Sequence, residues 1–258
     1  MSAYMEFLGS GTSTGVPVPG CRCRVCRSSD PRDRRLRASI LVARGRRRLV
    51  VDTGPEFRIQ CLRAEVERLD AVLITHVHAD HLNGLDDIRS YSWFKNRVVP
   101  VWGQKTVIAA VRKRFAYIWK PGQVGGGLPD IDLRIVSGPF RCLGMDVIPI
   151  PLKHGTMDIL GYRLGDLAYM TDVSAVPEFS FRFLENLETM VVSGVRCRSH
   201  PTHFSLAGVK RLHSRLRPVR TFLTHIGHQF SHRELLLELP RLDIFPAYDG
   251  LRIAIGGL

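Results

Sequence analysis

The chain has 258 residues, of which 45% are hydrophobic and 24% charged, so it can bury a core of its own and is not expected to be disordered. A formal net charge of +13 favours anionic partners without separating nucleic acid from a small phosphate, because arginine-rich surfaces also serve solubility alone. No apolar stretch approaches the roughly 20 residues that span a bilayer, and the N-terminus lacks a signal-peptide pattern. These features argue against a membrane protein and predict a cytoplasmic location.

Short runs rich in β-branched residues predict strands at 4–8, 39–43, 49–52, 71–75, 98–102, 131–136, 145–149, 160–164, 167–171, 189–193, 219–224 and 251–255. Helical periodicity predicts helices at 56–69, 105–115, 205–216 and 232–239, with Ser205 as an N-cap. A further helix is expected to begin at Pro177 and to end before Glu188. We interpret residues 122–129, with three consecutive glycines, as a flexible loop and not as a domain boundary.

The order of these elements indicates the fold class. Hairpin signals dominate the first part of the chain, and strands alternate with helices in both halves. This combination predicts an α/β fold in which two mixed sheets pack face to face with helices on the outside, an αββα sandwich. We expect a single domain over residues 1–258.

The strongest chemical signal follows the predicted strand at 71–75. His76, His78, Asp80 and His81 lie within six positions, directly after an apolar run. A strand that ends in a tight loop can aim these side chains at one place, with His76 and His78 toward one ion and Asp80 and His81 toward another. Imidazole and carboxylate ligands suit zinc, manganese or iron.

The spacing His-x-His-x-Asp-His resembles the signature of the metallo-β-lactamase superfamily in its two-metal hydrolase form. Other superfamily motifs match at strand ends, in the superfamily's order, at Asp52, His154, Asp172 and His225. The resemblance covers essentially the whole chain and implies the metallo-β-lactamase fold. It also implies that Asp52 supports the metal loop from outside the ligand set.

The resemblance implies a ligand assignment for two ions. One ion is held by His76, His78 and His154, the other by Asp80, His81 and His225, and Asp172 bridges them. The ions are expected about 3.5–4 Å apart, with a bridging hydroxide as the nucleophile and with the charge of the phosphoryl oxygens neutralised by the metals.

Three crowded cysteines indicate a second kind of metal site. Cys21, Cys23 and Cys26 fall within six positions, and without a secretory context they favour metal binding over disulfides. A closed tetrahedral zinc site needs a fourth ligand, for which we select His228, three residues beyond His225. The remaining cysteines, at 61, 142 and 197, are expected to be buried or inert thiols.

The glycine-rich segment 9–17, the Cys-x-Cys-x-x-Cys cluster and the segment 224–230 together resemble the PhnP family of phosphoribosyl cyclic phosphodiesterases. This resemblance implies two manganese ions in the active site, a separate structural zinc, a homodimer and hydrolysis of a small cyclic or diester phosphate. His203 matches the family's catalytic histidine, although a surface histidine beside a helix would look the same. With Asp80, it completes the expected catalytic residues.

Several alternatives stay open. His200 fits a substrate contact or a plain loop residue equally well, whereas His213 and His232 are expected at the surface. A tRNase Z-like 3′-processing endoribonuclease would explain the basic charge, but the segment between His154 and Asp172 is too short for a tRNA-clamping arm. A non-catalytic PqqB-like protein would have lost the ligands, and a lactamase or thioesterase on this fold is not distinguished by the ligands alone.

Overall fold

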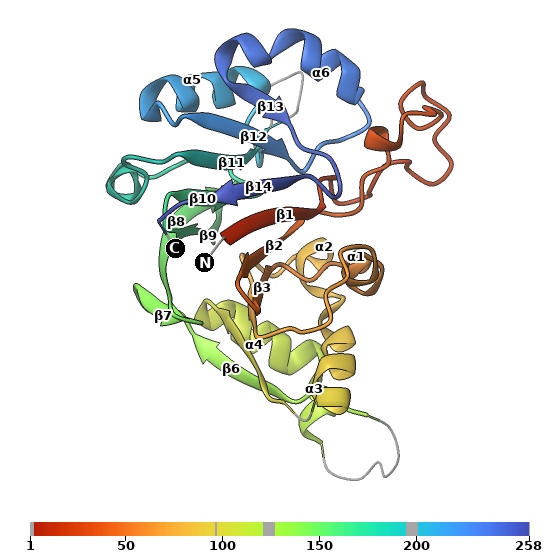
Figure 1. Cartoon of the computed structure of the whole chain (residues 1–258), viewed down its shortest axis with the longest axis vertical. Coiled ribbons are helices and arrows are strands. Elements are labelled where there is room, and N and C mark those ends of the chain that lie inside the picture. Colours follow the sequence, from red (N-terminus) through yellow and green to blue (C-terminus); the bar gives the residue numbers. More distant parts are fainter. Residues whose placement is uncertain (1–2, 96, 121–126, 195–200, 258) are drawn as a thin grey trace.

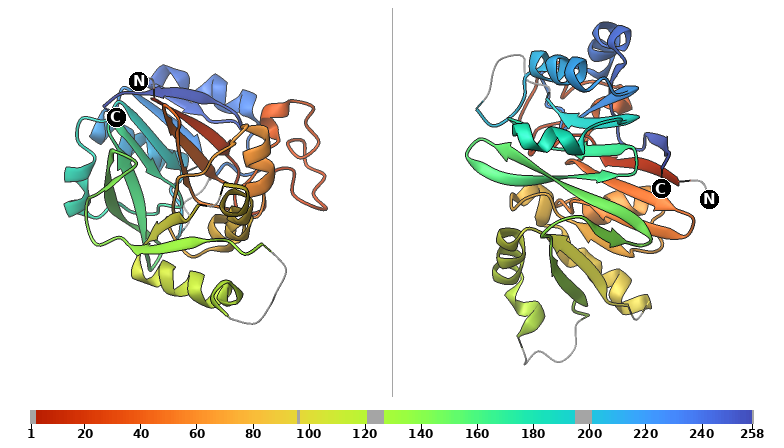
Figure 2. Two further views of the ribbon diagram at one scale, coloured as in Figure 1. Left: turned by 60° about the horizontal axis from the view of Figure 1, so that its bottom comes forward. Right: turned by 90° about the vertical axis from the view of Figure 1, so that its left-hand side faces the viewer.

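The computed structural model describes residues 3–95, 97–120, 127–194 and 201–257. Two seven-stranded sheets pack against each other, and helices cover their outer faces (Figures 1 and 2). The predicted αββα sandwich of the metallo-β-lactamase fold is therefore confirmed. In the part of the chain that is described, no helix has the length and apolar character needed to cross a membrane.

The first sheet has its strands in the order β14 (Arg252–Ile255), β1 (Ala3–Gly9), β2 (Ser39–Arg44), β3 (Arg47–Val51), β4 (Ala71–Leu73), β5 (Val99–Gly103) and β6 (Ile131–Ile135). The second has the order β13 (Ile244–Pro246), β12 (Arg220–Thr224), β11 (Thr189–Ser193), β10 (Leu167–Met170), β9 (Met157–Leu164), β8 (Met145–His154) and β7 (Phe140–Cys142). Strands β3 to β6 run parallel to one another, as do β10 to β13, whereas the other pairs are antiparallel. Parallel strands place their carboxyl ends at one edge of each sheet, where ligands commonly bind.

Helices α1 (Phe57–Arg63), α2 (Ala79–Leu82), α3 (Arg89–Lys95) and α4 (Lys105–Arg114) belong to the first sheet's side, and α5 (Leu206–Leu216) and α6 (His232–Glu238) to the second's. One apolar cluster joins the facing surfaces of the two sheets, for example through Phe7 and Tyr162. Two further clusters fill the space between each sheet and its helices. The three interfaces account for the four layers, because each sheet must bury both faces.

The helix predictions succeed where capping signals are strong. Helix α5 begins as expected, with the Ser205 hydroxyl accepting a hydrogen bond from the backbone N–H of Gly208. The prediction for 56–69 was too long, because α1 ends at Arg63 and Glu65 adopts a left-handed conformation with φ of 51°. The helix expected after Pro177 is a 3₁₀ helix, η4 (Glu178–Phe183), and strands β7 and β13 were not predicted.

Candidate metal centre

The predicted ligands of the active site, and Asp52, which was expected to support the metal loop, lie at the carboxyl ends of strands from both sheets. Asp52 follows β3, the motif from His76 to His81 follows β4, His154 ends β8, Asp172 follows β10 and His225 follows β12. Asp52, Asp172 and His225 have positive φ angles of 66°, 54° and 57°. Non-glycine residues adopt this conformation rarely, and it concentrates at functional sites where the surrounding fold enforces it.

The first donor group consists of His76, His78, His154 and Asp172, whose ligand atoms all lie within 4.8 Å of one another. Nε2 of His76 lies 3.1 Å from Nδ1 of His78. Oδ2 of Asp172 lies 3.8 Å from Nε2 of His76 and 3.9 Å from Nε2 of His154. The structure thus brings together the four residues expected around one ion.

The second donor group consists of Asp80, His81, Asp172 and His225. Nε2 of His81 lies 3.2 Å from Oδ2 of Asp80 and 3.6 Å from Oδ1 of Asp172. Nε2 of His225 lies 3.1 Å from Oδ1 of Asp172 and 3.4 Å from Oδ2 of Asp80. Asp172 therefore presents one oxygen to each donor group, which is the geometry of a bridging carboxylate.

Hydrogen bonds outside the donor groups orient the imidazole rings. Nδ1 of His81 donates to Asp52 at 2.8 Å, and Nδ1 of His154 donates to the carbonyl of Thr202 at 2.7 Å. The Thr75 hydroxyl lies 2.9 Å from Asp52, to which it donates, and 2.9 Å from Nδ1 of His76, from which it accepts. Each of these rings is left with Nε2 directed at its donor group, which is the usual role of such outer hydrogen bonds.

The donor chemistry fits divalent metal ions. At metal–nitrogen distances of about 2.0–2.1 Å, tetrahedral ligand atoms lie about 3.3 Å apart, close to the spacings within each group. Nε2 of His81 is buried and has no hydrogen-bond partner among the described residues, although it points at two carboxylates. A cation between these atoms would satisfy them.

The protonation states of His76, Asp172 and Asp80 agree with that fit. His81 differs, because burial opposes its charge but the carboxylates of Asp172 and Asp52 raise its pKa, so a cation bound at its Nε2 would displace a proton. Burial, with the neighbouring His81, lowers the pKa of His76 well below its ordinary value, so its ring is a neutral ligand. Burial opposes the charge of Asp172, but His225 and His81 hold its pKa well below the ordinary range. In the same way, hydrogen bonds from His225 and His81 outweigh burial and lower the pKa of Asp80. Both carboxylates are therefore ionised.

The predicted cysteine group also comes together. Sγ of Cys21, Cys23 and Cys26 lie 3.3, 3.6 and 3.5 Å from Nδ1 of His228. Tetrahedral zinc with bonds of about 2.3 Å to sulfur and 2.0 Å to nitrogen needs a separation of about 3.5 Å. A hydrogen bond from the backbone N–H of Cys26 lowers the pKa of Cys23 to about 6. The fourth ligand chosen from the sequence is thus in position for such an ion.

A buried ion pair beneath this segment was missed in the sequence. The side chains of Arg35 and Asp33 are 0% and 3% exposed and lie 2.8 Å apart. Arg35 also donates to the carbonyls of Gly227, at 2.9 Å, and Phe230, at 3.2 Å, on either side of His228. The sequence contains 37 Lys and Arg residues, and no pattern in it distinguishes Arg35 as the buried one.

The remaining histidines divide into three cases. The ring of His203 lies 4.9 Å from that of His154 and 5.2 Å from that of His225, so it stands beside both donor groups. His200 and Cys197 lie outside the described residues, as does part of the loop expected at 122–129. The surface position expected for His232 is wrong. This residue is 2% exposed, its backbone N–H donates to Asp33 at 2.7 Å, and its ring meets Tyr248.

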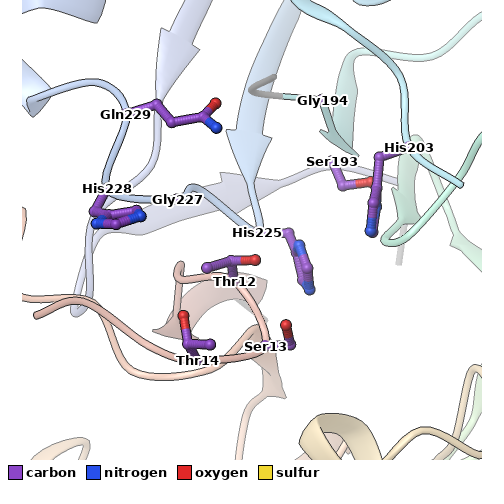
Figure 3. A pocket seen from close by; sticks show the side chains of 10 residues that line it. All are labelled: Thr12, Ser13, Thr14, Ser193, Gly194, His203, His225, Gly227, His228 and Gln229. Atoms are coloured by element: carbon purple, nitrogen blue, oxygen red, sulfur yellow. The ribbon is translucent and has the colours of Figure 1, made fainter. Parts of the chain in front are cut away.

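A cavity of about 210 Å³ opens beside the donor groups (Figure 3). His225 and His203 lie toward one side of it and His228 toward the other. Its wall comes from the loop after β1, the end of β11 and the segment after β12. The cavity therefore connects the surroundings of the donor groups with the cysteine group.

Residues 47–226 match the family model of the beta-lactamase superfamily domain. The chain belongs to this superfamily. Within it, the chain is 37% identical to a solved structure described as a new diphosphatase from the PhnP family, with a TM-score of 0.92 over 99% of this chain and 98% of that one. The protein is therefore a beta-lactamase superfamily member of the PhnP family, as its motifs predicted.

Two other similar proteins are less informative. An octanoyltransferase of Porphyromonas gingivalis is 36% identical over 253 residues, which is 96% of this chain but 51% of that protein. The chain thus spans about half the length of this curated relative. Zinc-bound PqqB from Methylobacterium extorquens is 18% identical with a TM-score of 0.76, over 98% of this chain and 100% of that one, and shares the fold.

Proposed function

We propose that this protein is a metal-dependent phosphodiesterase that hydrolyses a small cyclic or diester phosphate, of the kind represented by a phosphoribosyl 1,2-cyclic phosphate. The observation that carries the proposal is the position of Asp172, which presents one carboxylate oxygen to each of two donor groups. Two cations in such an arrangement would activate a water molecule and neutralise charge on the phosphoryl oxygens. We propose manganese for this pair and zinc for the cysteine group.

His203 is the proposed catalytic acid. Its ring stands beside His154 and His225, next to the place where a phosphoryl group held by both donor groups would sit. From there the imidazole can give a proton to the oxygen of the leaving group, which would otherwise depart as an alkoxide. Asp80 acts from within the second donor group, where its ionised carboxylate holds the imidazoles of His81 and His225 toward the site.

Two further observations support a small substrate. Between His154 and Asp172 the chain forms only the short connection to β9, the hairpin of β9 and β10, and the end of β10, so this stretch carries no arm of the kind expected for a tRNase Z. All members of both donor groups are present, unlike in the expected PqqB-like alternative. The related protein described as a diphosphatase makes a diphosphate the second candidate substrate.

The test combines metal analysis with a substrate panel. Purified protein loaded with manganese or zinc should hydrolyse ribose 1,2-cyclic phosphate or bis(4-nitrophenyl) phosphate faster than a phosphomonoester, and chelation should abolish the activity. His203→Ala should reduce kcat about 10²–10⁴-fold, whereas the matched control His213→Ala, on α5, should change it less than twofold. Activity that survives chelation, or an efficient cleavage of pre-tRNA trailers, would overturn the proposal.

We also propose that residues 1–258 form one domain, that the protein is a homodimer and that it works in the cytoplasm. The single-domain proposal is supported by the apolar cluster shared between the two sheets. Light scattering on the purified protein tests the homodimer, and fractionation of the source cells tests the cytoplasmic location. A monomeric mass at micromolar concentration would contradict the dimer.

A further inference from the structure

The backbone at His225 needs support from other segments of the chain. Its φ of 57° lies in the left-handed region, which a non-glycine residue keeps only where the surrounding structure enforces it. The next residue, Ile226, is fully buried; its backbone N–H donates to the carbonyl of Ser10 at 2.8 Å, and its carbonyl accepts from the N–H of Thr12 at 3.2 Å. Thr12 lies next to His225 (Figure 3). The segment 10–12 therefore holds the backbone from which this metal ligand projects.

The segment 10–12 is bound on its other side as well. The N–H of Gly11 donates to the carbonyl of Leu36 at 2.7 Å, so this segment lies between the backbone at Leu36 and that at Ile226. Glycine allows this close approach, since a Cβ at Gly11 would lie 2.7 Å from the carbonyl oxygen of Arg35. Three segments that are far apart in the chain thus run side by side next to the second donor group.

The carboxylate of Asp249 joins two of these segments. Its Oδ1 accepts from the backbone N–H of Ser10 at 2.8 Å and from the Ser10 hydroxyl at 2.7 Å, and its Oδ2 accepts from the backbone N–H of Leu36 at 2.8 Å. The guanidinium of Arg63 lies 3.1 Å from Oδ2 and supplies the opposite charge. Because the Asp249 side chain is only 7% exposed, these charge-assisted hydrogen bonds are shielded from water and are stronger than those of a neutral amide.

A turn between β13 and β14 fixes the position of Asp249 itself. The N–H of Gly250 donates to the carbonyl of Phe7 in β1 at 2.8 Å, and the N–H of Leu251 donates to the carbonyl of Tyr248 at 3.1 Å. Gly250 has a φ of 92°, a conformation that favours glycine. The carboxylate is thus anchored on the first sheet, whereas the ligand that it supports follows β12 in the second sheet.

We infer that Asp249 is a positioning residue for the metal ligand His225, and that it acts through the backbone at Ser10. Asp249 holds Ser10, whose carbonyl holds Ile226, the residue that follows this ligand. Metal–ligand distances vary by only about 0.2 Å, so a less firmly held backbone at this point weakens binding of an ion at the second donor group. The inference rests on the proposed phosphodiesterase function, because that function assigns a metal ion to this donor group.

The test measures metal affinity as well as turnover. In competition between the Mn²⁺-loaded protein and a fluorescent chelator, Asp249→Asn should weaken Mn²⁺ binding about tenfold, the lower end of the range for groups that orient a metal ligand. Ser10→Ala removes one hydrogen bond and keeps the backbone ones, so it should weaken binding only about threefold. With bis(4-nitrophenyl) phosphate, Asp249→Asn should need about ten times more Mn²⁺ for half of the maximal rate. Its kcat at saturating Mn²⁺ should stay within about threefold of the wild-type value, because Asp249 does not touch the reacting atoms.

Glu6→Gln is the matched control for a general loss of stability. The Glu6 side chain is 4% exposed, lies on β1 and accepts a hydrogen bond from Arg252 at 2.7 Å, so it is also a shielded carboxylate with an arginine partner. Both Glu6→Gln and Asp249→Asn should lower the melting temperature, but only Asp249→Asn should change Mn²⁺ affinity. An equal change of Mn²⁺ affinity in the two variants, or none in Asp249→Asn, overturns the inference.

Zinc content is a second control. Arg35 binds the carbonyls on either side of His228 independently of Asp249, so zinc at the cysteine group should stay at the wild-type level in Asp249→Asn. Loss of this zinc would show a wider disruption of the segment and would overturn the inference. If Asp249→Asn does not fold, Ser10→Ala decides through its own Mn²⁺ affinity. Wild-type protein that binds Mn²⁺ but hydrolyses no diester refutes the proposed function alone, because the chelator competition still decides the inference.

Discussion

Replacing the buried guanidinium of Arg35 should destabilise the protein strongly. Arg35→Met leaves the Asp33 carboxylate without its cation in a place where both side chains are at most 3% exposed. Methionine keeps most of the length of the side chain, so the variant chiefly removes charge and donors. The carbonyls of Gly227 and Phe230 lose their donated hydrogen bonds at the same time.

The expected loss follows from the cost of an unpaired buried charge. Removing one partner of a buried ion pair costs roughly 3–5 kcal/mol, and an unsatisfied carbonyl adds up to about 1–3 kcal/mol where water cannot reach it. We expect a decrease of about 4 kcal/mol in the free energy of unfolding, a large share of the 5–15 kcal/mol typical of a domain. The double variant Arg35→Met with Asp33→Asn should recover about 2 kcal/mol, because no buried charge remains.

Urea unfolding at saturating metal, followed by circular dichroism, measures these differences. Arg32→Met is a matched control, because Arg32 pairs with Asp30 at the same sequence spacing but is 46% exposed. The free energy of unfolding of Arg32→Met should fall by less than about 1 kcal/mol. A loss below 1 kcal/mol for Arg35→Met, or a double variant less stable than the single one, would refute the reasoning about the buried charge.

Four further outcomes are expected. Asp172→Asn should lower kcat at least about a thousandfold, measured with bis(4-nitrophenyl) phosphate, because the bridging carboxylate is shared by both donor groups. Cys23→Ser should remove one zinc per chain by metal analysis and lower the melting temperature; full stability with unchanged zinc would contradict the cysteine group's role. Asp52→Asn should weaken metal affinity about 10–100-fold in competition with a chelator, since Asp52 orients His81. Burial, followed by two nearby arginines, lowers the pKa of His232 to about 4. Its protonation therefore favours the unfolded chain, so stability should fall as pH decreases from about 6.5 toward 4, and His232→Gln should remove part of that decrease in urea unfolding.

Much of the candidate site was readable from the sequence because its chemistry is local. The cluster from His76 to His81 places four ligand-type side chains in six positions after an apolar strand, and few structural roles require that pattern. The cysteine group gave a similar signal with three thiols. Fold class followed from alternation of apolar residues and from the order of strands and helices, both of which are properties of the backbone's periodicity.

The tertiary structure determined which residues far apart in the chain come into contact. The sharing of Asp172 between two donor groups and the support of the metal loop by Asp52 were expected only from the family resemblance, and nothing local in the sequence indicated them. The pairing of the Thr12 loop with the segment at Gln229 was not expected at all. All of these contacts join residues far apart in sequence. Burial could not be predicted from the sequence either. Arginine and histidine are residue types common at protein surfaces, yet Arg35 and His232 both lie in the interior. Local sequence determines which groups are available and which elements they sit on. Packing of the two sheets determines which groups meet and which lose contact with water, because contact and desolvation arise only when distant segments come together.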